Sequence, residues 1–265
     1  MLAVLAEIVK TAAREELLPR FAESKRRFKA DGSIVTEADV AMQQRLTVEL
    51  AAFAPQYTLL GEEMTAEEQS ELLQAGDAGL WCLDPLDGTS NFASGIPFFC
   101  VSLALLIGRK PALGIVYDPI RDECFAAQAG LGASLNGRPL RCHAAGLDLR
   151  KGIAVVDFKR LPAQLAGALV TRPPYSSQRY FGSGVLEWAW LAANRYQVYL
   201  HGRQKLWDYA AGALILAEAG GLAESLEGGP IYTQALQPRS AVAACDPLLF
   251  GEWKAWLGRH LPDAS

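Results

Sequence analysis

The spacing of hydrophobic residues in the first part of the chain predicts helices separated by one short strand. The opening helix is expected to run for about five turns and to end near Pro19, with an apolar face made of Leu2, Leu5, Val9, Ala12 and Ala13. A second helix is expected over 36–53, a short apolar strand over 57–60 and an acidic helix over 64–74. Because the strand leads into Gly61-Glu62-Glu63, we expect two carboxylates where it ends.

From residue 80 the pattern changes to that of strands. Strands are expected over 80–83, 98–107, 112–117 and 124–127, and Asn136-Gly137 is a strong hairpin signal, so an antiparallel meander is predicted. The second half mixes strands at 153–156, 197–200, 222–225 and 241–244 with helices at 161–170, 185–193, 209–219 and 247–257. These alternating blocks predict a layered α+β fold, with an N-terminal lobe over 1–145 and a C-terminal lobe over 146–265.

Composition and charge narrow the classes of function. The 265 residues are 51% hydrophobic and 20% charged, which is enough for a substantial core in one or two domains. A net charge of −4, with no block of like charges, gives no indication of nucleic-acid binding through a basic face. The odd cysteine count and the lack of Cys-x-x-Cys spacing indicate reduced thiols in a cytoplasmic protein. We expect no signal peptide and no membrane association, because no apolar stretch approaches about 18 residues.

The most specific chemical signal is the run Trp81-Cys82-Leu83-Asp84-Pro85-Leu86-Asp87-Gly88-Thr89-Ser90-Asn91-Phe92. Asp84 and Asp87 follow a buried strand, and the proline between them stiffens the backbone. Gly88 and Thr89 come next and can turn free N–H groups toward an anion. Oxygen ligands beside amide donors suit a hard divalent cation that holds a phosphate. The alternative is an ordinary polar turn, since Pro, Asp and Gly all favour turns.

Three further acidic elements support the cation hypothesis. They are Asp39 at a helix start, the pair Glu62-Glu63 after a strand, and Asp208 at another helix start. Each has a simpler interpretation: Thr36 and Asp39 fit a capping box, Asp208 fits an N-cap, and the glutamates fit an exposed turn. A site for two Mg²⁺ ions needs about four or five carboxylates, and the chain offers that number at the ends of predicted elements.

Taken together, these residues resemble the inositol monophosphatase family of Mg²⁺-dependent, lithium-sensitive phosphatases. The resemblance covers nearly the whole chain in order and rests on Gly61-Glu62-Glu63, on Asp84 to Phe92, and on Trp207-Asp208-Tyr209-Ala210-Ala211-Gly212 with Glu218-Ala219-Gly220-Gly221. It implies a five-layered αβαβα sandwich and a homodimer. It also implies a phosphoric monoester hydrolase that acts on a small phosphorylated polyol or sugar.

The resemblance further implies a role for each acidic residue. A first Mg²⁺ would be held by Glu62, Asp84 and the main-chain carbonyl of Leu86. A second would be held by Asp84, Asp87 and Asp208. Glu63 would support the site or help to hold a third, weaker ion.

The catalytic residues implied by the resemblance are Asp39, Glu62 and Thr89. Thr89, paired with Asp39, would orient and deprotonate the attacking water, which a metal ion makes more acidic. The N–H groups of Gly88 and Thr89 would hold the phosphate. No covalent phosphoenzyme is needed, and the chain contains no Cys or Ser nucleophile motif.

The sequence departs from the family pattern where the substrate is recognised. The family uses a small-residue stretch, here Gly182-Ser183-Gly184, and a residue seven positions before the last metal aspartate. That residue is a glutamate in the inositol-specific members, whereas this chain has His201, followed by Gly202-Arg203-Gln204-Lys205. We therefore expect the substrate to contact Asp87, the glycine stretch, His201 and Arg203, although these basic side chains would also fit a solvated surface.

This donor-rich rim is compatible with more than one class of phosphorylated substrate. A substrate with a second anionic group, such as 3′-phosphoadenosine 5′-phosphate or fructose 1,6-bisphosphate, is an alternative to a polyol or sugar monophosphate. A protein that keeps a phosphatase fold mainly to bind or regulate a partner is an alternative of another class. The acidic set argues against the latter, because a binding module has no need to keep mutually repelling carboxylates together.

Overall fold

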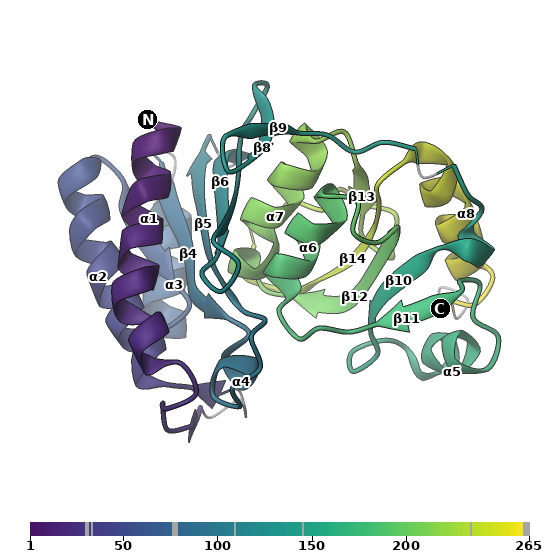
Figure 1. The fold of residues 1–265 in the computed structure, drawn as a ribbon, viewed down its shortest axis with the longest axis horizontal. Coiled ribbons are helices and arrows are strands. Elements are labelled where there is room, and N and C mark those ends of the chain that lie inside the picture. Colours follow the sequence, from purple (N-terminus) through teal and green to yellow (C-terminus); the bar gives the residue numbers. More distant parts are fainter. Residues whose placement is uncertain are drawn as a thin grey trace.

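Helices and sheets alternate across the molecule in the order α–β–α–β–α, as the sequence and its family resemblance predicted (Figure 1). The computed structural model describes residues 1–29, 32, 34–75, 79–108, 110–144, 146–233 and 235–261. Helices α1 and α2 cover the outer face of one sheet, α6 and α7 lie between the two sheets, and α5 and α8 lie beyond the second sheet (Figure 1). No helix of these described segments has both the length and the apolar character needed to cross a bilayer.

The secondary structure follows the predicted order closely. The helices of the described residues are α1 (Leu2–Glu16), α2 (Glu37–Phe53), α3 (Ala66–Ala75), α4 (Thr89–Phe92), α5 (Ala163–Thr171), α6 (Gly184–Ala192), α7 (Leu206–Glu218) and α8 (Pro247–Gly258), with short 3₁₀ turns at Leu18–Arg20 and Leu149–Lys151. The strands are β1 (Arg27–Phe28), β2 (Ile34–Val35), β3 (Thr58–Gly61), β4 (Leu80–Asp87), β5 (Cys100–Ile107), β6 (Lys110–Asp118), β7 (Glu123–Gln128), β8 (Gly132–Leu135), β9 (Arg138–Leu140), β10 (Ile153–Asp157), β11 (Ser177–Arg179), β12 (Val198–Gln204), β13 (Leu222–Glu224) and β14 (Arg239–Ala244).

The first large sheet has the order β3-β4-β5-β6-β7-β8-β9. From β4 onward it is the predicted antiparallel meander, and Asn136-Gly137 forms the turn between β8 and β9. β3 is parallel to β4, and α3 makes the crossover between them. Parallel neighbours end at the same edge of a sheet, so the carboxylates that follow β3 and close β4 lie at one edge.

The second sheet has the order β11-β10-β12-β14-β13. Its centre is the parallel pair β10 and β12, and β14 completes it in the antiparallel direction. The register of β10 and β12 places Asp157 opposite His201 at the ends of the two strands. This pairing brings together two polar residues that are far apart in the sequence.

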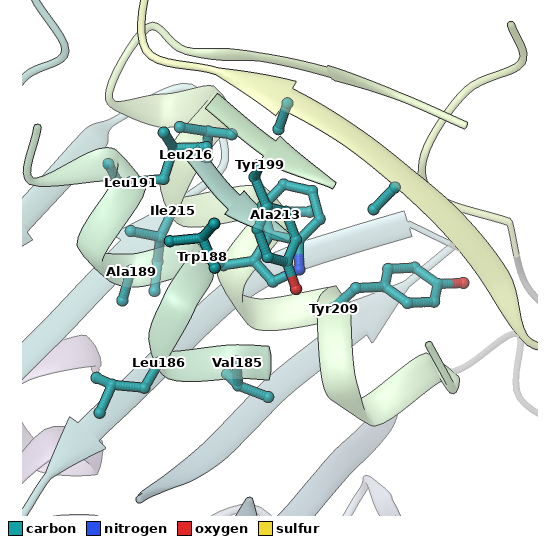
Figure 2. Close-up of a cluster of buried hydrophobic side chains, with 14 of the residues drawn as sticks. Val185, Leu186, Trp188, Ala189, Leu191, Tyr199, Tyr209, Ala213, Ile215 and Leu216 are labelled. Atoms are coloured by element: carbon teal, nitrogen blue, oxygen red, sulfur yellow. The ribbon is translucent and has the colours of Figure 1, made fainter. Parts of the chain in front are cut away.

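Helices α6 and α7 form the layer between the sheets, and their side chains are buried on most sides (Figure 2). The rings of Trp188 on α6 and Tyr199 on β12 lie 5.1 Å apart, and the Trp188 indole N–H donates to Gln204 Oε1 over 3.0 Å. A helix that is apolar on nearly every face is expected when sheets lie on both sides of it. The packing fixes the first turns of α6 and α7, which begin beside Ser183 and at Leu206.

Two details differ from the prediction. β4 continues to Asp87 instead of ending near residue 83, and its register with β5 shifts between Asp84 and Asp87. Pro85 lies within the shift, and a proline has no N–H to continue the ladder. α7 begins at Leu206, so Asp208 lies in its first turn and Lys205 is the N-cap, and the N-cap interpretation of Asp208 is wrong.

Candidate active site

One cavity of about 390 Å³ collects most of the residues that the sequence singled out. Five acidic residues line it, and four of them come from the end of β3, from β4 and from the first turn of α7: Glu62, Asp84, Asp87 and Asp208. The cavity is also lined by Leu86, Gly88, Thr89, Gly182, Gly184 and His201. The carboxylates that the sequence scatters from residue 62 to residue 208 therefore meet around one space.

The parallel pair β3 and β4 brings Glu62 and Asp84 together. Gly61 pairs with Leu83 in the ladder, and the Glu62 N–H extends it by donating to the Leu83 carbonyl over 3.1 Å. The Gln69 side-chain amide donates to the carbonyls of Gly61 and Glu62 and holds the turn after β3. The position of Glu62 is thus fixed by main-chain bonds rather than by its own carboxylate.

Asp84 is a buried carboxylate and Asp208 a half-buried one, and each accepts a main-chain hydrogen bond. Asp84, only 2% exposed, accepts one bond from the Leu86 N–H at 3.0 Å, and Asp208 accepts one from the Lys205 N–H at 2.8 Å. Burial raises the pKa of Asp84 well above its usual range, and the charges of neighbouring carboxylates raise it further. The pKa of Asp208 is raised by the same two causes. Such groups favour a nearby positive charge.

Asp87 joins β4 to the start of α6 through one of its oxygens. Its Oδ2 accepts from the Ser183 hydroxyl at 2.6 Å and from the Val185 N–H at 2.7 Å, at the start of α6. Burial raises its pKa to about 6, although both hydrogen bonds oppose the shift. Its other oxygen, Oδ1, has no hydrogen-bond partner among the described residues, so it is available to a ligand.

Thr89 and Asp39 are in contact, as the resemblance implied. Thr89 Oγ1 lies 3.0 Å from Asp39 Oδ1 and 2.9 Å from the Leu86 carbonyl oxygen, and its single proton can be donated to either. Asp39 Oδ2 accepts from the Thr36 N–H and hydroxyl, which completes the capping box of α2. Burial raises the pKa of Asp39 despite these bonds. The capping interpretation and the contact with Thr89 are therefore both correct.

Gly88 shapes the turn between β4 and α4. Its φ is +92°, and a Cβ on it would lie 3.1 Å from the Phe98 carbonyl oxygen and 3.2 Å from Ser183 Cβ. A residue with a side chain would be strained in this conformation. Gly88 and Thr89 are the N-cap and first residue of α4, so their N–H groups have no acceptor within the helix.

Lys29 contacts both glutamates that follow β3. Its ammonium group lies 2.7 Å from Glu63 Oε1 and 3.5 Å from Glu62 Oε1. Among the described residues, no group of three or more acidic, histidine or cysteine side chains stands in an arrangement that could hold a metal ion. A cation bound at Glu62 would therefore compete with Lys29 for that carboxylate.

The predicted substrate side is brought to the cavity only in part. Gly182 and Gly184 line it, whereas Ser183 is buried and donates to Asp87. His201 lines it, but its Nδ1 accepts from the Arg203 N–H at 3.2 Å and its Nε2 lies 3.0 Å from Asp157 Oδ2. An accepting Nδ1 places the ring proton on Nε2, where it is donated to Asp157. Arg203 is exposed and is not among the lining residues.

Several lining residues were missed by the sequence analysis. They are Asp157, Lys159, Arg160, Tyr180 and Gln204. The signal that could have found Asp157 is its position directly after the predicted strand over 153–156 and two residues before a basic pair. Its pairing with His201 depends on the register of β10 and β12, which local patterns do not specify.

Comparisons with known proteins agree with this geometry. Residues 1–263 match the model of the inositol monophosphatase family. The chain is 35% identical over 209 residues to Nus factor SuhB of Pasteurella multocida, covering 77% of this chain and 76% of that protein. It is 36% identical over 201 residues to inositol monophosphatase 1 of Solanum lycopersicum, covering 73% and 72%. An IMPase structure from Thermotoga maritima superposes with a TM-score of 0.84 at 26% identity, covering 97% and 96% of the two chains. The chain belongs to the inositol monophosphatase family.

Proposed function

We propose that this protein is a Mg²⁺-dependent phosphomonoesterase that hydrolyses a small phosphorylated polyol or sugar. The observation that carries the proposal is the group of Glu62, Asp84, Asp87 and Asp208 in one cavity, where Asp84 is buried and accepts a main-chain hydrogen bond from Leu86. Membership of the inositol monophosphatase family supports a phosphatase function. The relative from Solanum lycopersicum is itself named inositol monophosphatase 1.

The residues of the cavity fit hard divalent cations. Mg²⁺ prefers oxygen ligands, and the charges it brings would offset the repulsion among the carboxylates. Under this proposal Glu62, Asp84 and the Leu86 carbonyl hold one ion, and Asp84, Asp87 and Asp208 hold a second. Glu63, which is paired with Lys29 and is not among the lining residues, would support the site from beside Glu62 or, on release from Lys29, help to hold a third, weaker ion. Asp87 Oδ1 is free to bind while Oδ2 stays bonded to the start of α6.

The chain's own groups then perform the remaining steps. Thr89 orients a water molecule and passes a proton toward Asp39, whose contact at 3.0 Å and raised pKa suit it to accept one. The N–H groups of Gly88 and Thr89 bind the phosphate oxygens. Bound Mg²⁺ would supply a lowered pKa for water and positive charge against the phosphate and the leaving oxygen.

Compartment, assembly and inhibition form a second part of the proposal. We place the protein in the cytoplasm, consistent with its five free cysteines. A homodimer and sensitivity to Li⁺ are proposed from family membership. Sedimentation at several protein concentrations tests the homodimer, and phosphate release with added LiCl tests the sensitivity to Li⁺.

A binding or regulatory role without catalysis is the second candidate. It is favoured by the name Nus factor SuhB, which several relatives carry. The buried carboxylate of Asp84, surrounded by other carboxylates, favours the enzyme, because a docking surface gains nothing from burying it there.

Phosphate release from a panel of polyol, sugar and nucleotide monophosphates, with and without Mg²⁺, tests the function. We expect release only with Mg²⁺, and loss of release in Asp87→Asn. Asp148→Asn is the matched control, because Asp148 is half exposed and lies outside the cavity. Phosphate release that is independent of divalent cations would contradict the proposed chemistry. No release from any member of the panel would favour the binding protein.

A further inference from the structure

The wall of the cavity around Asp157 differs in charge from the wall that carries the metal-binding candidates. Besides the four carboxylates, the charged or titratable lining residues are Asp157, Lys159, Arg160, Tyr180, His201 and Lys205. Lys159 and Arg160 follow β10, and the Lys159 ammonium lies 5.8 Å from the centre of the Tyr180 ring. Neither forms an ion pair with any described carboxylate, so their charge is available to a ligand.

This basic pair is held in place by its surroundings. The Lys159 N–H donates to Asp157 Oδ1 over 2.9 Å, and the Arg160 guanidinium donates to the Arg203 carbonyl over 3.0 Å. A Cβ at position 202 would lie 2.1 Å from the Arg160 carbonyl oxygen, so only glycine there allows the segment to approach β12 so closely. The main chain of the pair is thus held against the ends of β10 and β12, and the Arg160 guanidinium is held by the Arg203 carbonyl, while both side chains stay exposed to a ligand in the cavity.

The same wall presents hydrogen-bond donors to a ligand but almost no hydrogen-bond acceptors. Both oxygens of Asp157 are already used, by the Lys159 N–H and by the His201 ring. Both nitrogens of His201 are used as well, because Nδ1 accepts from the Arg203 N–H. A polyol hydroxyl would find no free carboxylate here to accept its proton. A group with several acceptor oxygens and a negative charge would find an ammonium and a planar guanidinium.

We propose that Lys159 and Arg160 bind a second phosphate group, so that the preferred substrate is a small bisphosphorylated molecule. One phosphate is hydrolysed beside the carboxylates, where water adds to phosphorus and the ester oxygen leaves with a proton. The other phosphate stays intact and anchors the molecule at the basic pair. The inference rests on the proposed phosphatase function, which it makes more specific.

Matched pairs of substrates test this assignment. Each pair shares the phosphate to be removed and differs by one remote phosphate: fructose 1-phosphate with fructose 1,6-bisphosphate, adenosine 3′-phosphate with adenosine 3′,5′-bisphosphate, and inositol 1-phosphate with inositol 1,4-bisphosphate. For the wild type we expect kcat/KM to be at least about tenfold higher for the bisphosphate in one pair or more, chiefly through a lower KM.

Variants identify the residues responsible. In Lys159→Met/Arg160→Met, the ratio of the two kcat/KM values should fall about tenfold or more. The exchange Lys159→Arg/Arg160→Lys keeps both charges and should retain part of the preference. Arg150→Met/Lys151→Met is the matched control, because it removes an adjacent basic pair that lies outside this cavity. Thermal melts of each variant verify that it is folded.

The outcomes separate the two proposals. A wild type that releases phosphate with Mg²⁺ but shows no preference in any pair would overturn the second-phosphate assignment alone. An equal loss of preference in the Arg150/Lys151 control would also overturn it, because net charge would then be the cause. A wild type that hydrolyses no member of any pair, nor any monophosphate, would overturn the phosphatase function and this inference with it.

Discussion

Two regions of this protein bury aspartates equally deeply but treat their charge in opposite ways. Asp118, at the end of β6, is 0% exposed and accepts from the Ile120 and Arg121 N–H groups, and the Arg121 guanidinium lies 2.8 Å from its other oxygen. Asp84 in the cavity is 2% exposed and has one main-chain hydrogen bond and no cationic partner. Burial alone therefore does not distinguish a structural carboxylate from a functional one.

The difference lies in what compensates the charge. A buried carboxylate is tolerated when hydrogen bonds and an opposite charge replace its lost hydration. The turn at Asp118 supplies both from its own sequence. The cavity instead gathers further carboxylates around Asp84, whose charges raise its pKa in the absence of a bound cation. We expect removal of a carboxylate to have different consequences in the two regions.

The largest expected effect is on catalysis. Asp208→Asn should lower turnover about 10³-fold, roughly 4 kcal/mol in the activation barrier, because it removes a charged ligand from the proposed site. Steady-state assays on a substrate found with the wild type give the measurement. Retention of more than about a tenth of the wild-type rate would contradict a ligand role for this residue.

The second expected effect is a loss of folding stability, and it should appear only when the carboxylate at Asp118 is removed. Asp118→Ala should lower the free energy of unfolding by about 3 kcal/mol, since it leaves two partly buried N–H groups without their acceptor and the Arg121 guanidinium without its negative partner. Without divalent cations, Asp208→Asn should leave the protein as stable as the wild type or more so, because a repelled charge is removed. Urea unfolding in EDTA compares the two. A larger loss for Asp208→Asn than for Asp118→Ala would reverse the interpretation.

The response to Mg²⁺ should follow the same division. A ligand present at a hundred times its dissociation constant stabilises the folded state by about 2.7 kcal/mol. We expect the melting temperature of the wild type and of Asp118→Ala to rise with MgCl₂, and that of Asp208→Asn to rise much less. CaCl₂ and NaCl at matched ionic strength are the controls. An equal rise in all three proteins would indicate a general salt effect.

The smallest expected effect concerns a third buried carboxylate, Glu187. Its Oε1 accepts from the Phe181 and Gly182 N–H groups, Oε2 has no partner, and burial raises its pKa from 4.5 to about 8. Between these values the folded state binds more protons than the unfolded chain, so stability falls as the pH rises. Glu187→Gln should remove this loss, which is about 1.4 kcal/mol per pH unit. Denaturation at pH 6, 7 and 8 measures it, and a difference that does not change with pH would refute the assignment.

Much of the fold was predictable because its signals are local. Helical periodicity located α1 and α2, alternation and the Asn136-Gly137 turn located the meander, and the run from Asp84 to Thr89 located the cavity. The limits of α7 were harder to predict, because Leu206 and Trp207 are apolar residues that either a strand or a helix accepts.

The substrate side was less predictable because it depends on non-local register. Arg203 follows His201 closely in sequence, but it is exposed and does not line the cavity, and Arg160 from the turn after β10 lines it instead. The contact of Asp157 with His201 follows from the parallel pairing of β10 with β12. No short pattern in either segment encodes that pairing.

The capping box of α2 has a consequence for how this protein can change. Asp39 closes the first turn of that helix through Thr36 and also touches the Thr89 hydroxyl with its other oxygen. One carboxylate thus serves both the architecture of the N-terminal layer and the proposed proton transfer. Any replacement at this position disturbs both tasks at once, which makes Asp39 a poor place to tune the chemistry independently of the scaffold.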